Sequence, residues 1–361
     1  MKYRKLGNSG LIVSEVALGS MQFGSKMNMG GLDQKQTDSM VRCALDNGIN
    51  FIDTADVYSL GESETLLGNA LKAVRQEVVL ATKVRLPMSD NFNRSGATRA
   101  NIMMGVESSL RRLQTDYIDL YQIHGWDSNT PLEETVRTLD DLVRQGKVRY
   151  VGLSNYYAWQ AATALGIQER QHLEKYVTAQ MHYSLVNRGL EYEWLPFAEY
   201  YKIGILVWSP LAGGFLAGKY AKGQVPSAGT RFAEAGQFVL FDRNRGSEIV
   251  EVLKKVAGRH GASCARTAIA WTLARPGVSS VIIAGRKNEQ LTDNIAAVDM
   301  KLSEQDIQEL DRVSDPGVPY PQWMVHQLDV AEDPRPKILH PEKYADGGPW
   351  ADLRGTRWEK D

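Results

Sequence analysis

Four side chains capable of acid–base chemistry follow one another along the chain, most of them at the ends of short apolar runs. They are Asp53 in FIDTA, Tyr58 in the loop after it, Lys83 in EVVLATKV and His124 in YIDLYQIH. Isolated buried charges are costly, so Asp53 and Lys83 are expected to meet and pair. A free phenol has a pKa of about 10, and an adjacent ammonium lowers that pKa by stabilising the phenolate.

Such a set could move one proton on or off a carbonyl or alcohol oxygen. Asp53 would keep Lys83 charged and oriented, and Lys83 would tune Tyr58. His124 would position and polarise the substrate oxygen. Each residue also has a structural interpretation: an ion pair in a core, a surface aromatic, or a hydrogen-bonded histidine. Their occurrence in consecutive strand–helix units favours a site over packing alone.

Metal chemistry is the alternative that the histidines raise. His124 and His182 both stand near the ends of apolar runs, but no third ligand follows at a convincing spacing. A barrel that isomerises sugars with a metal would need a cluster of carboxylates at its strand ends, and this chain has none there. We therefore expect no metal site.

The elements that must position these residues are alternating strands and helices. The apolar runs are nearly continuous, as in parallel strands that are buried on both faces. The expected strands are 17–20, 51–55, 77–84, 117–124, 149–155, 177–183, 203–210 and 280–285. The expected helices include 36–48, 63–74 with Ser63 as its cap, 98–113 with a Thr98 cap, and 132–146. Eight such units close a (β/α)8 TIM barrel of the α/β class, whose active sites lie at the carboxyl ends of the strands.

Segments outside the eight units set the expected boundaries. YRKLGNSGLIVSEV should form an N-terminal β-hairpin that turns at Asn8–Gly10. Segment 211–238 and the tail from Pro316 are too long for simple connectors. We expect residues 1–325 to form the barrel and residues 326–361 to be a C-terminal extension. That extension would cover the site, exchange with a neighbouring copy or be loosely ordered.

Composition excludes several classes of protein. Forty-two Lys and Arg against 43 Asp and Glu give a net charge of −1, which disfavours a nucleic-acid groove or a polybasic membrane surface. The two cysteines, Cys43 and Cys264, cannot form a disulfide scaffold. No apolar run approaches the ~18 residues of a membrane span, and MKYRKLGNSG lacks the apolar core of a signal peptide. A cytoplasmic protein is expected.

Several motifs together resemble those of the aldo-keto reductase superfamily, from KLGNSGLIVSEVALGSMQFG to PYPQWM. They are GINFIDTADVYSLGESETLLG, LATKV, YIDLYQIHGWD, GKVRYVGLSN and VIIAGRKNEQLTDN. The chain is most similar to the longer bacterial members, in the branch that includes the voltage-gated potassium channel β subunits. The resemblance implies that Asp53, Tyr58, Lys83 and His124 are the catalytic tetrad. It also implies a nicotinamide dinucleotide bound without the GxGxxG fingerprint, which this sequence lacks.

The resemblance further implies a set of cofactor contacts at strand ends and in two loops. They are Ser20, Met21, Asp53, Ser154, Asn155, Gln180, Trp208, Ser209, Leu211, Gly213, Lys219, Arg231, Arg286, Gln290, Asp293 and Asn294. Within this set Ser154, Asn155 and Gln180 would hold the carboxamide, and the ring of Trp208 would stack on the nicotinamide. The loop 209–220 would fold over the pyrophosphate, where its small residues let backbone N–H groups approach.

The resemblance also implies that Arg286 faces the 2′-phosphate of the cofactor, which favours NADP over NAD. The expected substrate side includes Phe23, Tyr58, His124 and Trp126. The short loop GWDSNT would leave an open mouth that admits bulky or polar substrates. An aldehyde, a ketone or a keto-sugar would fit such a pocket. The alternative function is a redox-sensing regulatory subunit that holds NADPH with little turnover. Both a monomer and a homo-oligomer are compatible with the sequence. Neither nucleic acid nor a membrane is an expected partner.

Overall fold

The computed structural model describes residues 1–26, 31–220 and 239–331. Contacts divide the chain into two compact units, Met1–Asp315 and Pro316–Asp361, which we describe separately. The second unit contains helix α12 (Gln322–Ala331), on which Trp323, Val325 and Leu328 are exposed. This helix spans residues 325 and 326, and the boundary expected there stays a prediction. No helix in the described ranges is long and apolar enough to cross a membrane.

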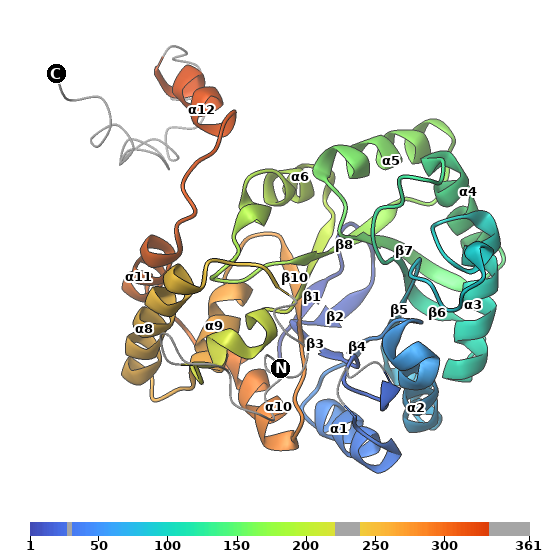
Figure 1. Cartoon of the computed structure of the whole chain (residues 1–361), viewed down its shortest axis with the longest axis horizontal. Coiled ribbons are helices and arrows are strands. Elements are labelled where there is room, and N and C mark those ends of the chain that lie inside the picture. Colours follow the sequence, from blue (N-terminus) through green and yellow to red (C-terminus); the bar gives the residue numbers. More distant parts are fainter. Residues whose placement is uncertain (27–30, 221–238, 332–361) are drawn as a thin grey trace. The chain divides into compact units, whose positions relative to one another are not determined.

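The first unit is a closed barrel of eight parallel strands, with the last strand paired to the first (Figure 1). The strands in spatial order are β3 (Val16–Gly19), β4 (Phe51–Asp53), β5 (Val79–Val84), β6 (Ile118–Ile123), β7 (Val148–Ser154), β8 (Tyr176–His182), β9 (Gly204–Trp208) and β10 (Val278–Ile283). Spatial order follows chain order throughout, so each connection leads to the neighbouring strand. The (β/α)8 barrel expected from the sequence is confirmed.

Helices surround the strands on the outside of the barrel (Figure 1). They are α1 (Gln34–Asp46), α2 (Glu62–Leu71), α3 (Arg99–Leu113), α4 (Leu132–Arg144), α5 (Ala158–Arg170), α6 (Trp194–Tyr201), α8 (Arg243–Arg259), α9 (Cys264–Leu273), α10 (Asn288–Ile295) and α11 (Glu304–Ser314). Side-chain caps start several of them, since a helix leaves its first N–H groups without partners. Thr98 accepts from the backbone N–H of Asn101, which confirms the expected cap of α3.

The core has two layers, separated by the strands. The larger cluster packs the outward faces of the strands against the helices, as Leu67, Val106 and Leu139 do. The smaller cluster contains only residues of strands and of the hairpin and so fills the barrel interior. The hairpin, β1 (Tyr3–Lys5) paired antiparallel with β2 (Ile12–Ser14), contributes Leu6 and Val13 to it. The hairpin therefore fills the end of the barrel at which the strands begin. The end at which the strands finish is left for a site.

Candidate active site

The tetrad expected from the sequence comes together at the carboxyl ends of β4, β5 and β6. Nζ of Lys83 lies 2.5 Å from Oδ1 of Asp53, 2.7 Å from the carbonyl oxygen of Thr54 and 3.4 Å from the hydroxyl of Tyr58. The rings of Tyr58 and His124 meet edge to face, with centroids 5.8 Å apart. Parallel strands place their carboxyl ends on one rim, which is why residues far apart in sequence meet here.

Lys83 is fully buried, and all three donors of its ammonium are used by the contacts above. Burial alone lowers the pKa of a lysine, but the charges and hydrogen bonds of Asp53 and Tyr58 together outweigh it, so the pKa of Lys83 lies above its ordinary 10.5. The side chain is therefore a fixed ammonium. It faces both a carboxylate and a phenol, and it can stabilise the phenolate.

His124 has the opposite electrostatic environment. Burial and the positive charges of Lys83 and Arg85 hold the pKa of His124 well below its usual 6.5. The ring is therefore neutral near pH 7 and carries a single N–H. Its Nδ1 is buried and has no hydrogen-bond partner among the described residues. A neutral imidazole at this position can direct a hydrogen bond at a substrate oxygen.

Asp53 is held by more than the lysine. Its Oδ2 accepts from Nε2 of Gln180 at 2.7 Å and from Nε2 of Gln122 at 3.4 Å. With Lys83 on Oδ1, one carboxylate on β4 thus joins side chains of β5, β6 and β8. Sequence reasoning missed Gln122, although it stands two residues before His124 and so on the same face of its strand.

The residues expected to hold a carboxamide form one connected chain. Oγ of Ser154 donates to the carbonyl of Gln180 at 2.8 Å, and Nδ2 of Asn155 donates to that Oγ at 2.9 Å. Nδ2 of Asn155 also reaches the carbonyl of His124 at 3.1 Å, and its Oδ1 accepts from Nε1 of Trp208 at 3.1 Å. These bonds fix the indole at the end of β9.

His182 is an unforeseen neighbour of that indole. Its ring centroid lies 4.7 Å from that of Trp208, and its Nε2 is buried without a hydrogen-bond partner among the described residues. Burial lowers the pKa of His182 to about 4, partly offset by a hydrogen bond with the backbone of Ser209.

The expected pyrophosphate loop begins in a strained backbone. Ser209 and Ala212 have φ values of 52° and 48°, and Gly213 and Gly214 follow at 69° and 95°. Non-glycine residues at positive φ cost free energy and cluster at functional sites. Leu211 lies between these positions, and Lys219 is exposed beyond them. Arg231 lies outside the described residues.

The expected adenosine phosphate segment lies at the start of α10. The N–H of Arg286 donates to Oε1 of Gln290 at 2.8 Å, and Nδ2 of Asn294 donates to the carbonyl of Ala284 at 3.0 Å. Asp293 is held by Arg266 at 2.6 Å. These bonds shape the turn before α10, and the contacts with a dinucleotide stay predictions.

The loop after β3 contains three further expected residues, Ser20, Met21 and Phe23. Oγ of Ser20 lies 3.0 Å from that of Ser63, and Met21 occupies the turn after β3. Phe23 is only 1% exposed and packs in the core, so its contact with substrate stays a prediction. The hydroxyl of Ser63 donates to the carbonyl of Ser20 at 2.9 Å.

An aromatic rim surrounds Trp126, the remaining residue expected on the substrate side. Its ring lies 5.1 Å from Tyr156 and 6.0 Å from Trp159, measured between centroids. Trp159 is 59% exposed, and the sequence analysis did not single it out. It also missed Arg85, whose Nη2 donates to the carbonyl of Trp126 at 3.0 Å. Arg85 thereby fixes the loop that follows His124.

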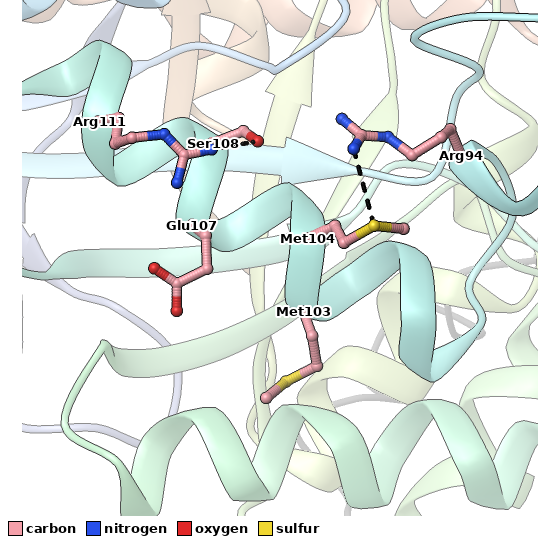
Figure 2. A pocket seen from close by; sticks show the side chains of 6 residues that line it. All are labelled: Arg94, Met103, Met104, Glu107, Ser108 and Arg111. Carbon is pink, nitrogen blue, oxygen red and sulfur yellow. Dashed lines mark hydrogen bonds between the residues drawn. The ribbon is translucent and has the colours of Figure 1, made fainter. Parts of the chain in front are cut away.

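A separate hollow of about 340 Å³ lies on helix α3 (Figure 2). It is lined by Arg94, Met103, Met104, Glu107, Ser108 and Arg111. The buried face of this helix carries other residues, such as Ile102 and Val106, so the hollow is on the outer side. No tetrad residue lines it, and it takes no part in the candidate site.

Comparison with known proteins decides the family. Residues 15–315 match the model of the Aldo/keto reductase family. The chain belongs to this family. A probable voltage-gated potassium channel subunit beta of Arabidopsis thaliana is 37% identical to this aldo/keto reductase over 308 residues, or 83% of this chain and 92% of the plant protein.

Two relatives with oxidoreductase names are about as similar. The uncharacterized oxidoreductase YrpG of Bacillus subtilis is 38% identical over 316 residues, which cover 84% of this chain and 93% of that protein. The versiconal hemiacetal acetate reductase of Aspergillus parasiticus is 36% identical over 344 residues, or 88% of this chain and 98% of the fungal protein. The resemblance inferred from the sequence motifs is confirmed, and the family supports an oxidoreductase that uses a nicotinamide cofactor.

Proposed function

We propose that this aldo/keto reductase is an NADPH-dependent enzyme that interconverts a carbonyl compound and its alcohol. The substrate would be an aldehyde, a ketone or a keto-sugar. One observation carries the proposal: the buried ammonium of Lys83 contacts both Asp53 and the hydroxyl of Tyr58. Packing of a phenol does not require a buried ammonium beside its hydroxyl. An acid–base catalyst does require such a group, because the ammonium stabilises the phenolate.

In the direction of reduction, Tyr58 gives its proton to the carbonyl oxygen and becomes a phenolate that Lys83 stabilises. The neutral ring of His124 donates a hydrogen bond to the same oxygen and so orients the carbonyl. Asp53 keeps the ammonium charged and in place. When bound, the dinucleotide supplies the hydride. In the reverse direction the phenolate of Tyr58 accepts the proton of the alcohol.

The residues present fit a dinucleotide. The indole of Trp208 is held by Asn155, so its face has a fixed orientation for stacking. The strained backbone at Ser209 and Ala212 begins a loop of small residues whose N–H groups suit a phosphate. Arg286 supplies a guanidinium for a 2′-phosphate, which supports NADP as the preferred cofactor.

The test is turnover with purified protein. Nicotinamide absorbance would be followed with NADPH and a panel of aldehydes, ketones and keto-sugars, and the best substrate would be repeated with NADH. Tyr58→Phe should lower kcat by orders of magnitude and leave NADPH affinity nearly unchanged. Tyr200→Phe, at a tyrosine that is 79% exposed on α6, is the matched control and should keep wild-type kcat. A Tyr58→Phe variant with full turnover would remove the tetrad from the mechanism.

A second candidate function follows from the relatives named as potassium channel β subunits. The protein would then hold NADPH and report its redox state to a partner. Tight NADPH binding with only trace turnover across the panel would favour this function. The intact contacts of Asp53, Tyr58 and Lys83 favour the enzyme. A cytoplasmic location is part of both proposals.

A further inference from the structure

The backbone immediately after Tyr58 is strained. Ser59, Leu60 and Gly61 follow with φ values of 48°, 53° and 88°, which is three consecutive residues in the left-handed region. A non-glycine residue there costs about 1–2 kcal/mol, and such strain persists only when the surroundings fix the conformation. Whatever fixes this turn also fixes the side chain of Tyr58.

Contacts on the near side of the turn come from the loop after β3. Oγ of Ser59 donates to the carbonyl of Lys26 at 3.1 Å. Oε2 of Glu62, at the start of α2, accepts from the N–H of Ser25 at 2.9 Å. Ser59 is fully buried, whereas Ser25 and Glu62 are not. These contacts secure the turn at the rim of the barrel.

The far side of the turn is held by an ion pair between α2 and α3. Oε2 of Glu64 lies 2.7 Å from Nε and 2.6 Å from Nη2 of Arg112. A Cβ atom on Gly61 would lie 2.8 Å from Cδ and Nε of the same arginine, so the arginine stem runs directly against the turn. A larger side chain at Gly61 would fit only if the Arg112 side chain moved away from the turn.

The same carboxylate also reaches the strand that carries the lysine. Oε1 of Glu64 accepts from Oγ1 of Thr82 at 2.6 Å, and Glu64 is fully buried. Thr82 and Lys83 are neighbours on β5 and point to opposite faces of it. The segment from Tyr58 to Glu64 therefore contacts both faces of one strand, with its first residue at Lys83 and its last at Thr82.

We propose that Glu64 and Arg112 are positioning residues that hold the left-handed turn and thereby set the Tyr58 hydroxyl against Lys83. The inference rests on the proposed role of Tyr58. Two further titratable groups lie close to the pair. Burial and the charge of Glu64 raise the pKa of Asp56, whose N–H donates to the carbonyl of Lys83 at 3.2 Å. Burial, Asp56 and Glu64 likewise raise the pKa of Tyr121.

The test begins with Glu64→Gln, which keeps the shape of the side chain and leaves the guanidinium without its counter-ion. We expect kcat to fall about 10- to 100-fold, since a misplacement of a catalytic group by about 1 Å can cost about 100-fold. The KM for NADPH should stay unchanged. The alkaline limb of the kcat–pH profile should move to higher pH, because the phenolate loses its close ammonium; loss of the Glu64 charge alone would move that limb to lower pH.

A matched control removes another mostly buried Arg–carboxylate pair. Arg75 and Asp119 lie 2.8 Å apart, and Asp119 also accepts from the N–H of Leu80. Asp119→Asn should lower the thermal midpoint as Glu64→Gln does and leave the pH profile of kcat unchanged. If both variants lose kcat in proportion to stability and neither profile moves, Glu64 is only structural and the proposal is wrong.

A rescue variant tests the strain directly. Leu60 is 47% exposed, so Leu60→Gly removes little packing, and glycine adopts its φ at no steric cost. Added to Glu64→Gln, it should restore much of the lost kcat. No restoration would overturn the claim that the pair stabilises a strained turn.

A readout without cofactor separates this inference from the proposed function. Tyrosinate absorbance would be titrated in proteins with and without Tyr58→Phe, so that the difference isolates one tyrosine. In the Glu64→Gln background that difference should move to higher pH. A shift in a protein that reduces no carbonyl would uphold the positioning role while the proposed function fails, and an unmoved difference would overturn the positioning role in an active enzyme.

Discussion

Nζ of Lys83 lies 2.5 Å from Oδ1 of Asp53, in a place where Lys83 is fully buried and Asp53 is 2% exposed. Neither charge could stay there alone, because desolvation of an unpaired ion costs several kcal/mol. The pair is therefore both a condition for folding at the carboxyl end of the barrel and the source of the charge that faces Tyr58. The proposed chemistry and the stability of the fold therefore depend on the same two side chains.

Asp53→Asn should lower the free energy of unfolding by about 3–5 kcal/mol, because it leaves the Lys83 ammonium buried without a counter-ion. Chemical denaturation measures this loss. The control is Asp141→Asn, which breaks an exposed ion pair with Arg99 and should cost at most about 1 kcal/mol. Equal losses in the two variants would show that Lys83 is not held as an ion.

Stability should fall in mild acid because of His182. Its folded pKa of about 4 lies below its ordinary 6.5, so the unfolded chain binds the proton more tightly. The free energy of unfolding therefore decreases as the pH falls from 6.5 to about 4, by about 1.4 kcal/mol per pH unit. Denaturation at several pH values should give a slope that is smaller by about 1.4 kcal/mol per pH unit in His182→Gln, because that variant lacks one titrating group. His172→Gln, at an exposed histidine, should keep the full slope.

Arg286→Ala should weaken NADPH binding by about 10- to 100-fold, the loss expected for charge-assisted hydrogen bonds to a phosphate. NADH lacks that phosphate, so its affinity should hardly change. Titration calorimetry with both cofactors measures the difference. Arg312→Ala, at an exposed arginine on α11, should affect neither. Equal losses for the two cofactors would refute the 2′-phosphate contact.

Trp126→Ala should raise the KM of carbonyl substrates that carry a ring, and spare short aliphatic aldehydes. The reason is that Trp126 is expected on the substrate side, and its ring lies 6.0 Å from that of Trp159, which is 59% exposed. We expect a loss of about 1–3 kcal/mol in transition-state binding, or about 10- to 100-fold in kcat/KM. Steady-state kinetics on a matched pair of aldehydes provides the measurement. Losses of the same size for both aldehydes would show that the rim does not select rings.

The order of apolar runs predicted the eight strands, because strands that are buried on both faces must be apolar throughout. It also predicted that the four residues of the expected tetrad meet, because parallel strands in a barrel end on one rim. Strand ends also pointed to Gln180 and Trp208 as site residues. The hydrogen-bond partners of these two residues were not predictable. Gln180, for example, donates to Asp53, which lies across the barrel and far away in the sequence. Such contacts depend on side-chain directions that spacing alone does not contain.

Local propensity failed at the tyrosine turn. Ser63 was expected to cap α2, but the helix begins at Glu62 after Gly61, and the Ser63 hydroxyl bonds instead to the carbonyl of Ser20. Leucine and serine do not favour positive φ, so the sequence does not predict the left-handed conformation of Ser59 and Leu60. Tertiary contacts override the intrinsic preference there. The helix expected over 36–48 is α1, which ends at Asp46, and Gly48 follows it with a φ of 81°.

The bonds of Asp53 to Lys83, Gln122 and Gln180 have a consequence for how this enzyme can evolve. Catalytic residues are commonly stability liabilities, so that their loss leaves a more robust protein. Here one carboxylate links four of the eight strands. A lineage that abandons the chemistry would weaken its barrel unless Lys83 and Asp53 were replaced together. Selection for a stable fold alone would therefore preserve Asp53 and Lys83, even in a descendant that no longer used the proposed reaction.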